Sequence, residues 1–165
     1  ESTAQRTIER VENALIASGQ FALPGKKALL ETTTAWTAML VDVAEVLVNA
    51  KKKQRAYYSG KKKRHTLKMQ LLIHATTHMI MCVTSGKGAT HDLTLLRGSE
   101  VRVHPEVALI GDAGYQGIWR LHRYSLTPHK ASKHHPLTSD ERLENRAIAS
   151  IRQPVEHVFE GLRPD

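Results

Sequence analysis

The chain has 165 residues, 41% of them hydrophobic, and contains no run of ~18 uncharged apolar residues, so we expect one soluble domain with a short appendage and no membrane span. The single cysteine, Cys82, lies in an apolar run, which excludes a disulfide framework or a thiolate metal site within the chain and favours a reducing, cytoplasmic setting. The formal net charge of +8 indicates an anionic partner.

The first predicted element is an amphipathic helix over residues 3–18. Apolar side chains recur there at helical spacing, at Ile8, Val11, Leu15 and Ile16. The polar side of this helix is either a recognition surface or a solvated face. Pro24 and Gly25 then break the pattern with turn chemistry. We therefore place a domain boundary near residue 25, which separates 1–25 from a larger domain over 26–165.

Strand-like and helical segments alternate in the larger domain. Three strands are followed by a short helix, a strand, a short helix, a strand and a long helix, over residues 37–43, 65–75, 78–84, 93–98, 107–110, 118–123, 125–127 and 140–162. Polar Thr76 and Thr77 indicate an antiparallel hairpin between the second and third strands. The long helix carries an apolar stripe from Leu143 to Leu162, with a kink or restart at Pro154. This order outlines an α/β fold of the RNase H-like type, a mixed sheet flanked by helices.

The positive charge is concentrated in one segment. Its basic residues are Lys51, Lys52, Lys53, Arg55, Lys61, Lys62, Lys63 and Arg64, and it has no acidic residue. The rest of the chain has 16 basic residues against 16 acidic ones, so this segment accounts for the whole excess. It is either a solvated or localisation-like basic loop, or a surface for phosphate backbones. Tyr57 and Tyr58 favour nucleic acid, because aromatic rings can stack on bases.

Asp42 interrupts the apolar run Ala38–Val43, where an unpaired carboxylate is costly to bury. A divalent cation, a nearby arginine or an exposed strand end would each resolve this cost. Asp112 follows a short apolar strand within a glycine-rich turn, a place where α/β sheets bind ligands and where Asp also caps helices. Glu156 lies on the long helix one turn after Arg152, a spacing that by itself favours a surface ion pair.

Two strand-borne aspartates and one helix-borne glutamate together suit phosphodiester chemistry. Their hard oxygen ligands favour Mg²⁺ or Mn²⁺, and two such ions ~4 Å apart activate the attacking oxygen and stabilise the leaving one. No side-chain nucleophile is needed. The three acids therefore form one candidate metal site, although Asp42, Asp112 and Glu156 are far apart in the sequence.

Several motifs resemble, in order along the chain, those of DDE transposases of the bacterial insertion-sequence-five family. They are Asp42-x-x-Glu45, Tyr57-Tyr58-Ser59-Gly60-Lys61-Lys62-Lys63 with His65-Thr66-Leu67-Lys68, Gly88-Ala89-Thr90-His91-Asp92, Gly111-Asp112-Ala113-Gly114-Tyr115-Gln116-Gly117 and Arg152-x3-Glu156. The family often has tyrosine where Ala149 stands and lysine where Arg163 stands, so this sequence departs from the family pattern at those two positions.

The resemblance implies that Asp42, Asp112 and Glu156 are the catalytic, metal-binding triad of a DNA transposase. It also implies that Arg152, Arg163 and Lys68 join the basic segment in binding DNA, and that the protein acts as a homo-oligomer on DNA. His91 and Asp92 would orient the adjacent loop and basic strand rather than hold metal. The helix over 3–18 would be the second helix of a helix-turn-helix, so we expect the sequence to be part of a longer protein.

Two other functions remain open from the sequence. A non-catalytic DNA-binding fragment of a transposase would keep the fold and the charge without acting on DNA ends. An RNase H-like nuclease of another pathway would keep the acids but not the lysine-rich and Tyr-Gln-Gly motifs.

Overall fold

The computed structural model describes residues 3–20, 22–31, 37–48 and 55–160, without the side chains of residues 156, 157, 159 and 160. Its helices are α1 (Thr3–Ala17), α2 (Gly25–Ala28), α3 (Asp92–Gly98) and α4 (Ser139–Glu160), and its 3-10 turns are η1 (Arg55–Tyr57), η2 (Ala113–Tyr115) and η3 (Ile118–Arg120). The strands are β1 (Ala38–Leu47), β2 (Tyr58–Ser59), β3 (Arg64–His74), β4 (Ile80–Lys87), β5 (Ala108–Gly111) and β6 (Ser125–Leu126).

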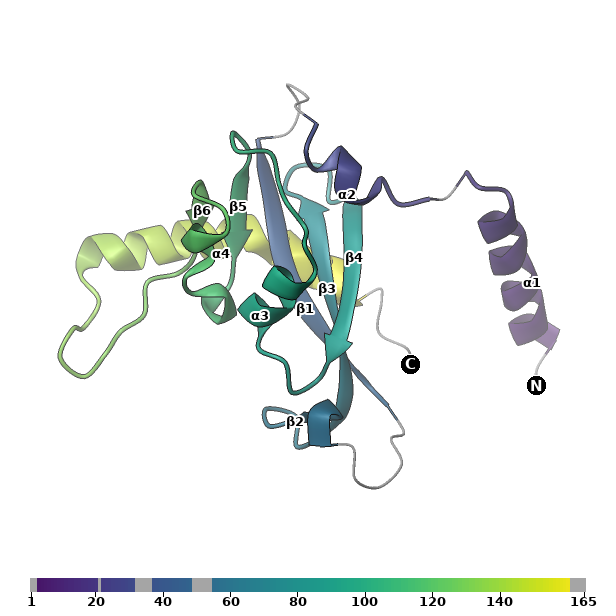
Figure 1. Cartoon of the computed structure of the whole chain (residues 1–165), viewed down its shortest axis with the longest axis horizontal. Coiled ribbons are helices and arrows are strands. Elements are labelled where there is room, and N and C mark those ends of the chain that lie inside the picture. Colours follow the sequence, from purple (N-terminus) through teal and green to yellow (C-terminus); the bar gives the residue numbers. More distant parts are fainter. Residues whose placement is uncertain (1–2, 21, 32–36, 49–54, 161–165) are drawn as a thin grey trace.

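The strands form one mixed sheet in the order β2-β3-β1-β5-β6, with β4 also paired to β3. Strand β3 runs antiparallel to both β1 and β4, whereas β5 is parallel to β1 and to β6. Figure 1 shows α4 crossing behind this sheet and α3 lying in front of it. The mixed α/β architecture agrees with the predicted RNase H-like class.

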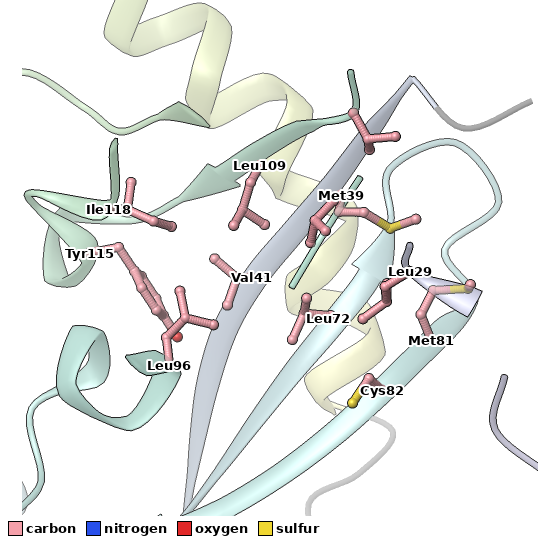
Figure 2. Close-up of a cluster of buried hydrophobic side chains, with 12 residues drawn as sticks. Leu29, Met39, Val41, Leu72, Met81, Cys82, Leu96, Leu109, Tyr115 and Ile118 are labelled. Atoms are coloured by element: carbon pink, nitrogen blue, oxygen red, sulfur yellow. The ribbon is translucent and has the colours of Figure 1, made fainter. Parts of the chain in front are cut away.

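Alternation along the strands divides the core between the two faces of the sheet. Met39 and Val41 of β1 belong to the cluster on the α3 side, whereas Leu40 between them belongs to the cluster on the α4 side. The α3-side cluster also includes Leu29, Leu72, Met81, Leu96, Leu109 and Tyr115 (Figure 2). The α4-side cluster is completed by Leu71, Ile73, Ile110, Ile148 and Val155. β1 is therefore covered on both faces where its apolar run begins.

The predicted elements are recovered with shifted ends. β1 continues four residues past the predicted Val43, and β3 and β4 form the expected hairpin. Residues 118–123 were expected to be helical, but only Ile118–Arg120 forms a 3-10 turn. Figure 1 shows the two-residue strand β2, which the sequence patterns did not predict.

Helix α4 buries a narrower stripe than its apolar residues predict. Ile148 and Val155 are buried in the core, but Leu143 is 66% exposed and Ile151 is 43% exposed. The first turns of α4 extend beyond the sheet in Figure 1, so no strand covers them. Pro154 lies inside the helix without ending it.

Helix α1 forms where the sequence predicted it and has no buried residue. Its apolar positions Ile8, Val11, Leu15 and Ile16 are all exposed. The division of the chain near residue 25 and the assignment of α1 to a helix-turn-helix thus stay predictions.

Gly88 provides a test of the fold next to the candidate site. Its N–H donates to the Thr66 carbonyl, and an added β-carbon would lie 2.6 Å from that oxygen, 2.7 Å from the Tyr57 carbonyl and closer still to the Thr66 hydroxyl. Because two of these atoms belong to the backbone and cannot rotate away, Gly88→Ala should lower the free energy of unfolding by roughly 1–3 kcal/mol. Urea unfolding measures this change.

Gly98→Ala is the matched control, since nothing lies within 4 Å of the position that its β-carbon would take at the end of α3. Alanine there should leave stability unchanged or raise it by up to ~1 kcal/mol. Equal effects of the two substitutions would contradict the packing described around Gly88.

Candidate active site

An open groove is lined by the second half of β1 and by residues of β2, β3, the loop between β4 and α3, and α4. β5 pairs only with Ala38–Val41, so no strand among the described residues pairs with the edge of β1 opposite β3 from Asp42 onward. The groove has acidic residues in its lining, namely Asp42, Glu45, Asp92 and Asp112. Basic residues also line it, namely Lys61, Lys62, Arg64, Lys68 and Arg152. Most of the described residues predicted to carry the chemistry thus share one surface.

The parallel register of β1 and β5 brings Asp42 and Asp112 together. The last pair between the two strands is Val41 with Gly111, and each aspartate is the next residue along the chain. The negative charge of Asp112 is accordingly one of the causes that raise the pKa of Asp42. The structure thus brings together two of the three predicted acids, which are 70 residues apart in the sequence.

Both carboxylate oxygens of Asp42 have hydrogen-bond donors. Oδ1 accepts from the Val43 N–H at 2.8 Å, and Oδ2 accepts from Nη2 of Arg152 at 2.8 Å. Burial nevertheless raises the pKa of Asp42 above its ordinary value, because Arg152 and the Val43 amide only partly offset the loss of water. Of the three solutions open from the sequence, the structure shows the arginine partner.

The third predicted acid lies on the helix that supplies Arg152. Asp42 lies on the α4 side of the sheet because it alternates with Val41. Arg152 reaches it from α4, and Glu156 is one helical turn further along the same helix. The side chain of Glu156 lies outside the described residues, so its meeting with the two aspartates stays a prediction.

The turn after β5 holds the carboxylate of Asp112 in place. Asp112 caps η2, and its Oδ1 accepts from the Gly114 N–H at 2.8 Å. A β-carbon at Gly114 would lie 2.6 Å from Oδ2 of Asp92 and 2.9 Å from Oδ1 of Asp112. Both carboxylates therefore approach the same glycine, and only a residue without a side chain permits that approach.

Asp92 is paired with a lysine that the sequence analysis assigned to DNA. Nζ of Lys68 lies 2.7 Å from Oδ1 of Asp92 and donates to the Thr90 carbonyl at 2.7 Å. The Lys68 side chain is only 11% exposed, so a phosphate would have to compete with Asp92 for it. His91, the residue before α3, is exposed and makes no side-chain capping bond. The DNA contact of Lys68 stays a prediction.

Tyr115 and Gln70 form a buried layer beneath the acids that the sequence analysis missed. The Tyr115 hydroxyl donates to Oε1 of Gln70 at 3.2 Å, and Nε2 of Gln70 donates to the Thr84 hydroxyl at 3.1 Å. Burial first, and then the charges of Asp92, Asp42 and Asp112, raise the pKa of Tyr115 far above its ordinary value, so its hydroxyl stays protonated and can donate. The sequence feature that could have revealed this layer is Gln70, a polar residue inside an apolar strand.

The basic segment ends in a tight turn between β2 and β3. Ser59 pairs with Arg64, and the buried Ser59 hydroxyl accepts from the N–H of Lys62 at 3.2 Å. Lys61, Lys62 and Lys63 are exposed along this turn, with Lys63 in the left-handed region at φ 51°. Arg55 is exposed on η1, whereas residues 51–53 and Arg163 lie outside the described residues.

The comparison with known families covers most of this site. Residues 41–165 match the family described as DDE superfamily endonuclease, a range that begins one residue before Asp42 and includes α4. The chain belongs to the DDE superfamily endonuclease family. Its membership of the insertion-sequence-five subgroup stays a prediction.

This DDE endonuclease chain is also similar to a curated protein. It is 41% identical over 164 residues to the "Probable transposase for insertion sequence element IS702" of Microchaete diplosiphon. The match covers 99% of this chain and 59% of that protein, so the chain spans little more than half of the relative's length. No solved structure matches the chain. Among its described residues, no helix is long and apolar enough to cross a membrane.

The raised pKa of Asp42 predicts how the metal-free DDE domain responds to pH. Well below pH 3.8, the ordinary pKa of Asp, Asp42 is protonated in both the folded and the unfolded chain. As the pH rises past this value, Asp42 ionises in the unfolded chain before it ionises in the folded chain. The folded chain therefore loses stability relative to the unfolded chain. Asp42→Asn removes this penalty. In EDTA, the variant should therefore gain stability relative to the parent as pH rises from about 3 to 7.

Urea unfolding across that pH range measures the difference, with the exposed Glu106→Gln as control. The control should follow the parent more closely at every pH. A stability difference between Asp42→Asn and the parent that does not change with pH would contradict the buried, charge-disfavouring environment of Asp42.

Proposed function

We propose that this chain is the catalytic part of a DNA transposase that cleaves at transposon ends and joins them to target DNA. The observation that supports this most is the register of β1 and β5, which sets Asp42 beside Asp112 at the head of a groove with basic residues in its lining. Family membership supports the nuclease chemistry. The name of the curated relative, a probable transposase, supports transposition as the process in which this nuclease chemistry takes part.

The proposed reaction consists of two in-line displacements at phosphorus. In the first, water attacks a phosphodiester at the transposon end, the P–O3′ bond breaks, and a free 3′-hydroxyl is released. In the second, this 3′-hydroxyl attacks a phosphodiester of the target, forms a new P–O3′ bond, and releases a target 3′-hydroxyl. Neither step needs a protein nucleophile, and none of the groove's polar side chains is required as one.

The residues present suit divalent cations, although no group of three His, Cys, Asp or Glu that could hold one is found within the described part of the chain. Asp42 and Asp112 offer adjacent carboxylate oxygens, and Gly114 leaves room beside Asp112 that a β-carbon would fill. We propose that these two aspartates and Glu156 hold two Mg²⁺ or Mn²⁺ ions. When bound, the ions would supply activation of the attacking oxygen and stabilisation of the leaving oxygen.

The surrounding residues have supporting roles in this proposal. Asp92 holds Lys68 and faces Gly114, so it orients the turn that carries Asp112, and His91 lies at the start of the same helix. The exposed lysines of the β2–β3 turn bind the phosphates of the DNA. Base readout then belongs to the region of α1, as the proposed helix of a helix-turn-helix. The working form on DNA is a homo-oligomer.

Substitution of the acids tests the proposed chemistry. Asp42→Asn and Asp112→Asn should each abolish Mn²⁺-dependent nicking of a supercoiled plasmid by the chain, because loss of a metal ligand removes the activated oxygen. In EDTA, where no metal contributes to DNA binding, the DNA affinity of Asp112→Asn should change by less than about threefold, since the basic residues remain. Electrophoresis of the plasmid and fluorescence anisotropy of a labelled duplex measure the two effects.

Glu106→Gln, an exposed acid that does not line the groove, should retain both activities. Retained nicking by Asp112→Asn would overturn the assignment of the site. Absence of nicking in the parent, with tight DNA binding, would favour the non-catalytic DNA-binding alternative. Nicking without joining of ends would instead favour an RNase H-like nuclease of another pathway.

Neutralisation of the β2–β3 turn tests the DNA-binding surface separately. Replacing Lys61, Lys62, Lys63 and Arg64 with Ala should reduce the slope of log affinity against log salt by ~0.9 for each phosphate that the variant no longer binds. Sequence preference should hardly change, because binding to phosphates carries no base readout. Anisotropy titrations at several salt concentrations measure the slope.

Lys130→Ala combined with Lys133→Ala removes two exposed lysines that do not line the groove. This control should keep a slope close to that of the parent. If the turn variant also keeps the parent's slope, the lysines of the turn are solvated charges and the DNA follows another face.

A further inference from the structure

Arg152 holds the carboxylate that a metal ion would need. Its Nη2 lies 2.8 Å from Oδ2 of Asp42, while Oδ1 of the same carboxylate already accepts the Val43 N–H. Both side chains of the ion pair are 20% exposed, so the pair lies in a partly dehydrated environment. Removing either partner from such a pair leaves a costly unpaired charge. Arg152 therefore leaves Asp42 readily only when another cation replaces it.

The position of Arg152 gives the released guanidinium an alternative partner. Arg152 lines the same groove as Lys61, Lys62 and Arg64. A guanidinium has several N–H donors in a planar fork that matches the oxygens of a phosphate. Its attachment to α4 keeps it at the groove when it leaves Asp42. A phosphate entering the groove is thus the nearest partner for the freed charge.

We propose that Arg152 is a counter-ion to Asp42 that a divalent cation displaces, after which it positions a DNA phosphate in the groove. This inference rests on the proposed function, because it requires the cation to bind at Asp42 and Asp112. In the metal-free chain, Arg152 neutralises Asp42 and is withheld from DNA. In the metal-loaded chain, the same side chain is available to DNA.

Competition between Arg152 and the cation has two consequences that can be measured. Removing the arginine removes a competitor and a repelling charge, so the cation should bind more tightly. Since binding of metal frees a phosphate ligand, metal and DNA should strengthen each other's binding, and this coupling is reciprocal. Part of the coupling does not involve Arg152, because a cation attracts phosphate directly. The decrease in coupling on replacing Arg152 is therefore the quantity that tests the proposal.

The experiment compares the parent chain with Arg152→Gln and Arg152→Lys. Free Mn²⁺ is titrated by electron paramagnetic resonance, and the affinity for a labelled duplex is measured by anisotropy in EDTA and in saturating Mn²⁺. Arg146→Gln is the matched control, since Arg146 is an exposed arginine on the same helix outside the groove. Circular dichroism verifies that each variant is folded, and Arg152→Lys replaces Arg152→Gln where the latter is not.

Arg152→Gln should bind Mn²⁺ about three- to tenfold more tightly than the parent. Saturating Mn²⁺ should raise the DNA affinity of the parent at least fivefold. The corresponding increase for Arg152→Gln should be less than half of the increase measured for the parent. Arg152→Lys, which keeps the charge but not the planar fork, should fall between the two in both measurements. Arg146→Gln should match the parent.

The proposal is overturned if Arg152→Gln binds Mn²⁺ no more tightly than the parent, or if it keeps the parent's full coupling between Mn²⁺ and DNA. A failure of the proposed function gives a different result. Asp112→Asn would then bind Mn²⁺ as well as the parent does, which would show that the cation is not held at the paired aspartates.

Discussion

The parallel pairing of β1 with β5 is the constraint on which the candidate active site depends. It extends only to Val41 and Gly111, so the two strands end their pairing at the same level and present Asp42 and Asp112 side by side. The remaining length of β1, from Asp42 to Leu47, lines the groove. Because the apolar residues of β1 are fixed in the core on both faces, a slip of one residue would move Asp42 to the other side of the sheet, away from α4.

Two ion pairs in the groove join charges from different elements. Asp42 pairs with Arg152 across the sheet and helix, and Asp92 pairs with Lys68 across α3 and β3. Pairing from separate elements ties the sheet to its flanking helices at the point where chemistry is proposed. Pairing with Arg152 does not fully offset the cost of burying the ionised Asp42 carboxylate, since the pKa of Asp42 stays raised. A site that keeps carboxylates together without metal is expected to lower the stability of the fold, as functional sites commonly do.

Local contacts also account for the two aspartates without catalysis. Asp42 has its arginine, and Asp112 caps a 3-10 turn. Arg152 competes with a cation for Asp42 in our proposal, but both local roles leave the two carboxylates adjacent and in an open groove. The DDE family match over residues 41–165 and the transposase relative agree with that arrangement, although the chain spans only 59% of the relative. What distinguishes an active site here is the convergence of the acids rather than the environment of any one of them.

The sequence by itself determined which residues are exceptional and in what order the elements run. Asp42 within an apolar strand and Asp112 in a glycine-rich turn were recognisable because a charge is costly in an apolar segment and glycine permits close approach. The alternation of strands and helices likewise followed from hydrophobic periodicity. The sequence could not give the partners that are far apart along the chain, namely the Arg152–Asp42 and Lys68–Asp92 ion pairs and the Tyr115–Gln70 hydrogen bond. It also could not give the exposure of Leu143 on α4. Local pattern carries no information on which strand lies next to which or where a helix outruns the sheet, so these features were decided only by the tertiary structure.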